Sequence, residues 1–121
     1  MGLILADTNV IIYMLEGDEV IAQLFDENRI AISFVTELEL LSGKKYSQSQ
    51  SKFLNTAIEK CSVFNYDNFI KESCIRLRIK YSLKLPDSLI AATSLAYHLP
   101  LFTSDKQFAK IKEIETSIYT F

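Results

Sequence analysis

The sequence predicts a three-layer α/β/α fold with a mainly parallel central sheet, in a single domain over residues 1–121. Short apolar runs rich in β-branched residues alternate with longer segments whose apolar residues recur at helical spacing. This alternation is typical of a parallel sheet covered by helices on both faces. The chain has 121 residues, of which 49% are hydrophobic and 23% charged. That composition is ordinary for a folded domain with one core, and we find no repeat or linker that would divide it.

The first half of the chain begins with a buried strand that ends in a polar turn. In order, we expect a strand at residues 3–5, a short helix at 10–12, a helix at 19–25, a strand at 30–35 and a helix at 36–43. Asp18 can cap the second of these helices. Thr36 and Glu39 have the spacing of a capping box for the third, and Gly43 is expected to end it.

The second half continues the alternation after a polar segment at 44–51, which we expect to be a loop or a frayed turn. We then expect a helix around 53–58, a strand at 61–64, a helix at 69–81, a helix at 86–97, a strand at 101–103, a short helix at 106–111 and a strand at 117–121. Asp67 or Asn68 can cap the long helix. Pro86 suits the first turn of the following helix, and Pro100 prevents its continuation.

Four acidic residues stand at junctions between these elements: Asp7, Glu39, Asp87 and Asp105. Asp7 and Asp105 end apolar strands, Asp87 opens a helix, and Glu39 follows the strand at 30–35. Residues at such junctions point into the crevice beyond the carboxyl edge of a parallel sheet, so we expect these side chains to meet there. Four carboxylates repel unless a hard cation lies among them, and oxygen-only ligands suit Mg²⁺ or Mn²⁺. The sequence therefore predicts a divalent metal site.

Such a metal would support phosphodiester hydrolysis, because it polarises phosphate oxygens and lowers the pKa of a bound water. Taken singly, each acidic residue also has a structural explanation as a helix cap or turn residue, so it is their joint placement that favours the metal site. His98 is the only histidine, and Cys61 and Cys74 lack zinc spacing, which leaves little support for histidine-based or zinc chemistry. The net charge of −2 gives no basic field, although a bound dication would offset local negative charge.

We expect a cytoplasmic protein that has no membrane segment. The N-terminus lacks the basic region and cleavage site of a signal peptide. The longest uncharged stretch, 88–104, contains Pro100 and several hydroxyls, and it is interpreted as helix, turn and strand. The two cysteines are interpreted as buried, reduced thiols.

Four segments together carry a resemblance to a known family: Leu5–Ile12, Ser33–Gly43, Leu85–Thr93 and Leu101–Phe108. They resemble, in order and spacing, the motifs of PIN-domain ribonucleases, and in particular the VapC-type toxins of type II toxin–antitoxin systems. The resemblance extends from residue 3 to residue 121 and implies a PIN-like fold. The family's metal-binding aspartates fall on Asp7, Asp87 and Asp105. Its glutamate falls on Glu39 rather than on the neighbouring Glu37.

The resemblance implies a Mg²⁺-dependent endoribonuclease, with Mn²⁺ as an alternative ion. Asp7, Asp87 and Asp105 would hold the metal and Glu39 would assist or orient water, while Asn9 and Thr103 would support these groups. It also implies an RNA substrate, a cognate antitoxin protein and often a homodimer. Apolar positions near Val20, Ile21 and Leu24 are candidates for such protein contacts.

Six basic residues form a candidate RNA-contacting surface: Lys44, Lys45, Arg76, Arg78, Lys80 and Lys84. Long cationic side chains beside the crevice would contact phosphates without reading sequence. The alternative interpretation is a solvated helix face.

Two other functions stay open. A receiver-like phosphoacceptor domain has similar length, alternation and an acidic Mg²⁺ pocket, but it usually has paired acids after its first strand and an aspartate on a middle strand. A catalytically silent PIN-like binding module is the other alternative.

Overall fold

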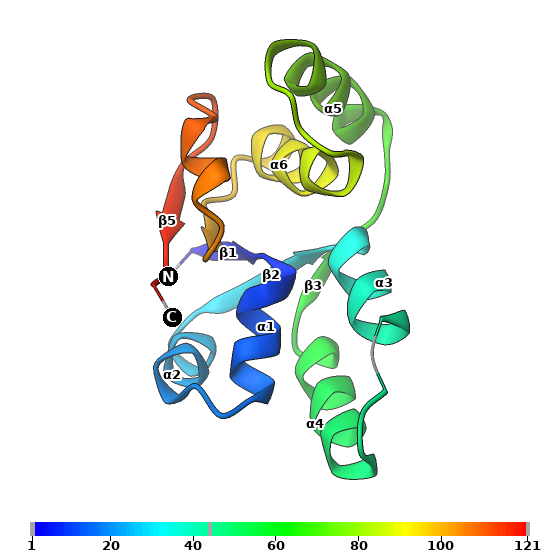
Figure 1. Cartoon of the computed structure of the whole chain (residues 1–121), viewed down its shortest axis with the longest axis vertical. Coiled ribbons are helices and arrows are strands. Elements are labelled where there is room, and N and C mark those ends of the chain that lie inside the picture. Colours follow the sequence, from blue (N-terminus) through cyan, green and yellow to red (C-terminus); the bar gives the residue numbers. More distant parts are fainter. Residues whose placement is uncertain (1, 44, 121) are drawn as a thin grey trace.

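A five-stranded, all-parallel sheet forms the centre of the computed structural model, which describes residues 2–43 and 45–120 (Figure 1). Its strands are β1 (Leu3–Ala6), β2 (Arg29–Ser33), β3 (Ser62–Phe64), β4 (Leu101–Thr103) and β5 (Thr116–Ile118). The spatial order is β3-β2-β1-β4-β5, and every neighbouring pair is parallel. The sheet order reverses between β1 and β4, which places a crevice at their carboxyl ends.

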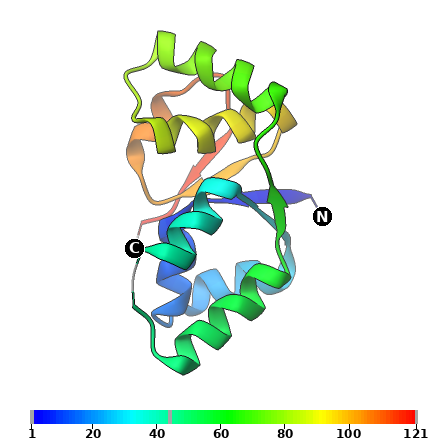
Figure 2. The same cartoon turned by 90° about the vertical axis from the view of Figure 1, so that its right-hand side faces the viewer.

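Helices cover both faces of this sheet (Figures 1 and 2). They are α1 (Thr8–Leu15), α2 (Glu19–Glu27), α3 (Phe34–Ser42), α4 (Gln48–Glu59), α5 (Asn68–Lys80), α6 (Leu85–Tyr97) and the short 3₁₀ helix η1 (Lys106–Lys110). Helices α1, α2 and α4 lie on one side, and α5 and α6 lie on the other. Helix α3 contacts both α1 and α6. The predicted three-layer α/β/α fold is confirmed.

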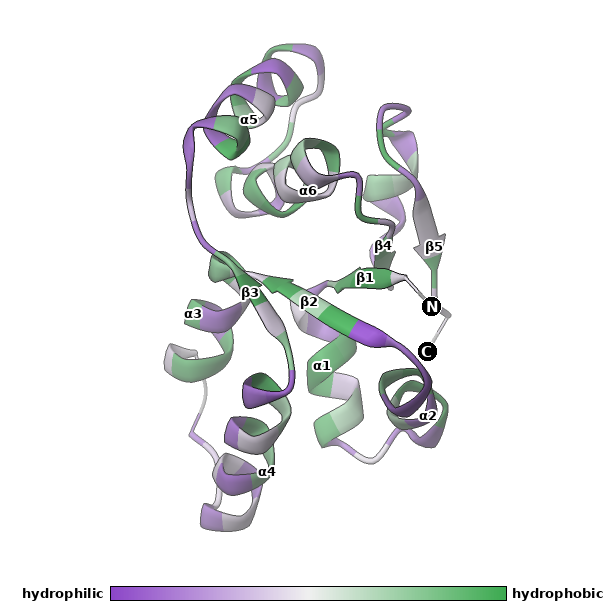
Figure 3. Cartoon of the chain, turned by 180° about the vertical axis from the view of Figure 1, so that it is seen from behind, coloured by the Kyte–Doolittle hydropathy of each residue, from purple (hydrophilic) through white to green (hydrophobic). Residues whose placement is uncertain are grey.

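Strand β2 shows how the sequence produces these layers. Ala31 packs in the cluster formed with α5 and α6, whereas Ile30 and Ile32 pack in the cluster formed with α1, α2 and α4. Successive side chains of a strand point to opposite faces, so an uninterrupted apolar run suits a strand that is covered on both sides. Each fully buried isoleucine stabilises the fold by about 1.5–3 kcal/mol. Figure 3 shows the same pattern, since the central strands are mainly hydrophobic and α4 and α5 are mixed.

Several predicted helix ends are confirmed by their hydrogen bonds. Asp18 Oδ1 accepts the backbone N–H of Ile21 at 3.0 Å, and Asp67 Oδ1 accepts that of Ile70 at 2.9 Å. Gly43 ends α3 as expected, and a Cβ at this position would lie 2.8 Å from the carbonyl oxygen of Glu39. That distance excludes a larger residue unless the backbone moves.

The predicted capping box of Thr36 and Glu39 is wrong. The strand ends at Ser33, whose Oγ accepts the backbone N–H of Val35 at 3.1 Å and caps a helix that begins at Phe34. Thr36 therefore lies inside α3, where its side chain is buried. The side chain of Glu39 is free to bond elsewhere.

The segment predicted to be a loop at 44–51 contains the start of α4 at Gln48. Ser47 and Gln50 form a full capping box there, with Ser47 Oγ accepting the Gln50 N–H at 3.2 Å and Gln50 Oε1 accepting the Ser47 N–H at 3.1 Å. The low apolar content of this turn hides the helix, because its first residues face solvent.

The remaining structural predictions concern the cysteines and the membrane. Both cysteines are free, but only Cys74 is buried, while Cys61 is partly exposed. Among the helices described, none combines the length and apolar character required to cross a bilayer.

Candidate active site

An acidic pocket of about 290 Å³ lies at the carboxyl edge of the sheet, where β1 and β4 end. All four acidic residues predicted to meet there line it: Asp7, Glu39, Asp87 and Asp105. The rest of the lining is Thr8, Asn9, Ile12, Gly43, Tyr46 and Ile90. The fold thus brings together carboxylates from four separate segments of the chain.

Asp7 is the most enclosed of these acids, with 6% of its surface exposed. It follows β1, and its Oδ1 accepts the Thr8 backbone N–H at 2.8 Å while its Oδ2 accepts the Thr103 hydroxyl at 2.7 Å. Burial raises the pKa of Asp7, the bonds from Thr103 and Thr8 oppose that rise, and the charges of Asp87 and Asp105 add to it. The predicted supporting residue Thr103 therefore contacts Asp7 directly.

Asp87 lies in the first turn of α6 and is partly exposed. Its Oδ2 accepts a hydrogen bond from Gln107 Nε2 at 3.1 Å. The pKa of Asp87 is raised, first by partial burial and then by the charge of Asp105, with a smaller contribution from Glu39; Gln107 and Lys84 act in the opposite direction. The charges of Asp105 and Glu39 therefore act on the Asp87 carboxyl from across the pocket.

Asp105 follows β4 and caps η1. Its Oδ1 accepts the backbone N–H of Gln107 at 3.0 Å, and its Oδ2 accepts the side-chain Nε2 of the same residue at 2.7 Å. Its own backbone N–H donates to the Thr103 hydroxyl oxygen at 3.0 Å. Sequence reasoning missed Gln107, because nothing in the local pattern indicates that its side chain reaches Asp87, twenty positions earlier.

Glu39 projects from α3 into the pocket, whereas Glu37 is not among the lining residues. Its Oε1 accepts the Thr8 hydroxyl at 2.6 Å, and that hydroxyl lies 3.0 Å from the buried hydroxyl of Thr36. Asn9 is exposed on the lining. Thr8 and Thr36 form a hydroxyl support that sequence reasoning missed, although the Asp-Thr-Asn motif placed Thr8 next to the first acid.

Within residues 2–43 and 45–120, no three His, Cys, Asp or Glu side chains stand close enough to surround a metal ion as they are placed. Neutral donors bind three of these carboxylates, namely Thr103 on Asp7 and Gln107 on Asp87 and Asp105. The chemistry of these side chains nevertheless fits a hard dication. Carboxylates offer only oxygen ligands, and their negative charges repel one another unless a cation lies among them.

Five of the six basic residues predicted to contact RNA lie among the described residues, and all five are exposed. Lys84 lies near Asp87, and Lys45 is exposed next to Tyr46 of the acidic pocket. Lys80 pairs with Glu113 at 3.0 Å. Arg76 is exposed on α5, Arg78 lines a shallow hollow with Ile75, Ile79, Leu83 and Lys84, and Lys44 lies outside the described residues.

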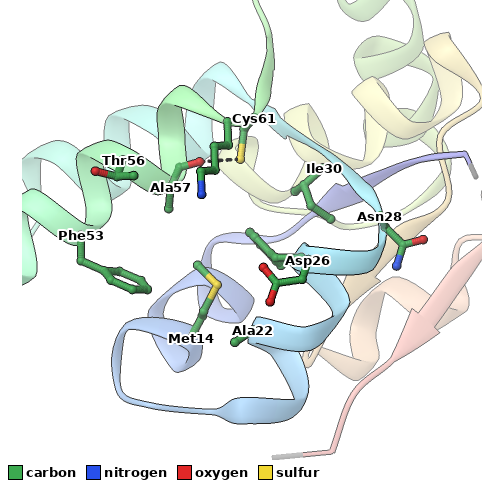
Figure 4. Close-up of a pocket in the computed structure, with 11 residues that line it drawn as sticks. Met14, Ala22, Asp26, Asn28, Ile30, Phe53, Thr56, Ala57 and Cys61 are labelled. Atoms are coloured by element: carbon green, nitrogen blue, oxygen red, sulfur yellow. Dashed lines mark hydrogen bonds between the residues drawn. The ribbon is translucent and has the colours of Figure 1, made fainter.

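A second pocket, of about 310 Å³, is lined mainly by apolar residues of α1, α2 and α4, including Met14, Phe25 and Phe53 (Figure 4). None of the four acidic residues of the first pocket lines it. Of the positions predicted to contact partners on α2, Val20 is 63% exposed, but Ile21 is fully buried and belongs to the core. The interpretation of Ile21 as a contact residue is therefore wrong.

Comparison with known proteins identifies the family of this chain. The family model of the PIN domain matches residues 4–114. A toxin–antitoxin complex from Klebsiella pneumoniae contains a chain that is 30% identical, with a TM-score of 0.83, covering 98% of this chain and 99% of that one. The structure of VapBC2 from Rickettsia felis bound to a promoter DNA fragment gives 18% identity and a TM-score of 0.87, covering 98% and 100%.

DNA-bound VapBC from Salmonella typhimurium is also similar, with 22% identity and a TM-score of 0.86 over 99% of this chain and 100% of that one. A comparison with curated proteins gives no match. The family match spans most of the chain. The chain belongs to the PIN domain family, a family of nucleases.

Proposed function

We propose that this protein is a Mg²⁺-dependent endoribonuclease that hydrolyses RNA phosphodiester bonds and acts as the toxin of a toxin–antitoxin pair. The observation that carries the proposal is the convergence of Asp7, Asp87 and Asp105 on one pocket in a PIN fold. Similarity to toxin–antitoxin complexes supports a cognate antitoxin as the partner. We expect the protein to act in the cytoplasm. We also expect it to form a homodimer, and light scattering can test this by comparing the mass in solution with the 13.8 kDa mass of one chain.

Asp7, Asp87 and Asp105 would hold the metal, with Mg²⁺ or Mn²⁺ as the ion that suits their oxygens. The bound ion would polarise the phosphodiester and lower the pKa of water. Thr103 holds Oδ2 of Asp7 and therefore fixes the orientation of the most buried ligand. Asn9 would supply an amide at the lining of the same pocket.

Glu39 would orient the attacking water and accept its proton. Its Oε1 is held by the Thr8 hydroxyl at 2.6 Å, which leaves Oε2 to face a water. Because Glu39 is exposed, it can exchange that proton with solvent. Lys45 and Lys84 would contact phosphates of the RNA beside the pocket, and the charge of Lys84 opposes the rise in the pKa of Asp87.

The receiver-like alternative is disfavoured by the third strand as well as by the family match. The first acid after β3 is Asp67, and its two oxygens accept the Ile70 N–H and the Tyr97 hydroxyl. Asp67 therefore serves as a helix cap and is not a free phosphoacceptor. The silent binding module is disfavoured because all four acids reach the pocket.

Cleavage of RNA by purified protein with Mg²⁺ tests the proposal. Asp7→Asn and Asp87→Asn should each lower the rate at least about 100-fold, the scale on which one group that stabilises transition-state charge acts. Asp26→Asn, an exposed aspartate of the apolar pocket, is the matched control and should keep full activity. Undiminished cleavage by both Asp7→Asn and Asp87→Asn would refute the proposal. Labelling by a small phosphodonor without cleavage would favour the receiver-like function.

A further inference from the structure

Gln107 joins two acids of the pocket through one side-chain amide. Its Nε2 donates to Asp105 Oδ2 at 2.7 Å and to Asp87 Oδ2 at 3.1 Å. A carboxamide nitrogen carries two hydrogens, so it can serve one carboxylate with each. Carboxylates only accept hydrogen bonds, and it is therefore the nitrogen of the amide, not its oxygen, that faces them.

The backbone fixes this side chain in place. Gln107 is the second residue of η1, and its backbone N–H binds Asp105 Oδ1 at 3.0 Å, so the Asp105 carboxylate is held by two groups of one residue. The next residue, Phe108, is fully buried and anchors η1 to the core. Gln107 is itself partly buried, which limits the alternative rotamers of its side chain.

The bridge opposes a repulsion that the fold creates. Asp87 and Asp105 come from α6 and from the end of β4, and the charge of one disfavours the charge of the other. A neutral donor between them offsets part of that repulsion without adding a charge. Gln107 is not among the residues that line the acidic pocket, whereas Asp87 and Asp105 both line it.

We propose that Gln107 is a positioning residue that holds Asp87 and Asp105 at the separation needed to receive the divalent metal. This inference rests on the proposed nuclease function. Each carboxylate oxygen can accept more than one partner, so the amide bonds and a metal bond can coexist. When a group that hydrogen-bonds a metal-ligating side chain is removed, metal affinity typically falls about 10- to 100-fold.

Calorimetric titration of purified protein with Mn²⁺ tests this role directly. Gln107→Met keeps the length of the side chain and removes both donors, so the Mn²⁺ Kd should rise about 10- to 100-fold. Gln23→Met is the matched control, because Gln23 Nε2 donates to Glu27 within α2 at 2.9 Å and Gln23 does not line the acidic pocket. Its Mn²⁺ Kd should equal that of the wild type.

Cleavage assays separate positioning from general damage. The Mn²⁺ concentration for half-maximal activity should rise with Gln107→Met, while kcat at saturating Mn²⁺ stays near the wild-type value. If Gln107→Met does not fold, Gln107→Asn keeps the amide but shortens its reach. It should still raise the Kd, since it cannot span both acids.

The outcomes distinguish this inference from the proposed function. A wild-type protein that binds no Mn²⁺ and cleaves no RNA would overturn both. A wild-type protein that binds Mn²⁺, together with a folded Gln107 variant of the same Kd, would overturn the positioning role alone.

Discussion

Thr103 provides the sharpest test of how the pocket is built, because one hydroxyl serves two acids. It donates to Asp7 Oδ2 at 2.7 Å and accepts the backbone N–H of Asp105 at 3.0 Å. Thr103 is fully buried, and Asp7 is 6% exposed. Thr103→Val keeps the shape of the side chain and removes both hydrogen bonds, so its effect isolates their contribution.

The expected loss follows from the two bonds. A hydrogen bond to a charged group contributes about 1.5–3 kcal/mol, and a neutral one contributes about 0.5–1.5 kcal/mol. We therefore expect Thr103→Val to lower the free energy of unfolding by about 2–4.5 kcal/mol, a large share of the roughly 5–15 kcal/mol of a typical domain. The pKa of Asp7 should also rise further, since the Thr103 bond is among the groups that lower it.

Urea unfolding in EDTA measures this loss without interference from metal. Thr56→Val is the matched control, because its hydroxyl donates to the Lys52 carbonyl at 3.0 Å on the exposed side of α4. That change should cost less than about 0.5 kcal/mol. A Thr103→Val protein within about 0.5 kcal/mol of the wild type would refute the view that this hydroxyl organises the pocket.

Three further predictions concern other groups. The folded pKa of Asp87 is raised above its ordinary value of 3.8, so any stability it contributes is present below that value and is lost as the pH rises through the folded pKa. The free energy of unfolding of Asp87→Asn should therefore increase relative to that of the wild type as the pH rises from acid to neutral in EDTA. A difference between the two proteins in urea unfolding that does not change with pH would contradict this. Burial raises the pKa of the Cys61 thiol from 9.0 to about 11. Alkylation of Cys61 by iodoacetamide at pH 8 should therefore be about 100-fold slower in the folded protein than in the urea-unfolded chain, and equal rates would contradict this prediction. Gly43→Ala should destabilise by about 1–3 kcal/mol in thermal unfolding, because its Cβ would lie 2.8 Å from the Glu39 carbonyl oxygen, and an unchanged midpoint would contradict that contact.

The sheet and the meeting of the acids were predictable from the sequence, because both depend on periodicity and topology. An apolar run such as Ile30 to Ile32 is buried on both faces only in a covered sheet, and the ends of parallel strands share one edge. Once the strands are ordered, Asp7 and Asp105 reach the same edge of the sheet, since β1 and β4 are neighbours. The family motifs then selected Glu39 over Glu37.

The contacts that support the acids were not predictable in the same way. The Thr8 hydroxyl bonds to Glu39 across 31 positions, and Gln107 reaches Asp87 across 20. Such bonds depend on tertiary placement, which local spacing does not encode. The start of α3 was misjudged for a related reason, because Thr36 fits a capping box locally, yet Ser33 is the residue at the end of the strand.

The energetics of the pocket favour a functional role over a silent one. Burial and the neighbouring charges raise the pKa values of Asp7 and Asp87, which means that the folded protein disfavours their ionised forms. Ordinary selection for stability would replace such groups with apolar residues of similar size, which are often neutral or stabilising. The chain instead holds them with donors from Thr103 and Gln107. Acids whose pKa values are raised and whose oxygens are held by donors in a shared pocket are typical of active sites, where stability is given up for chemistry.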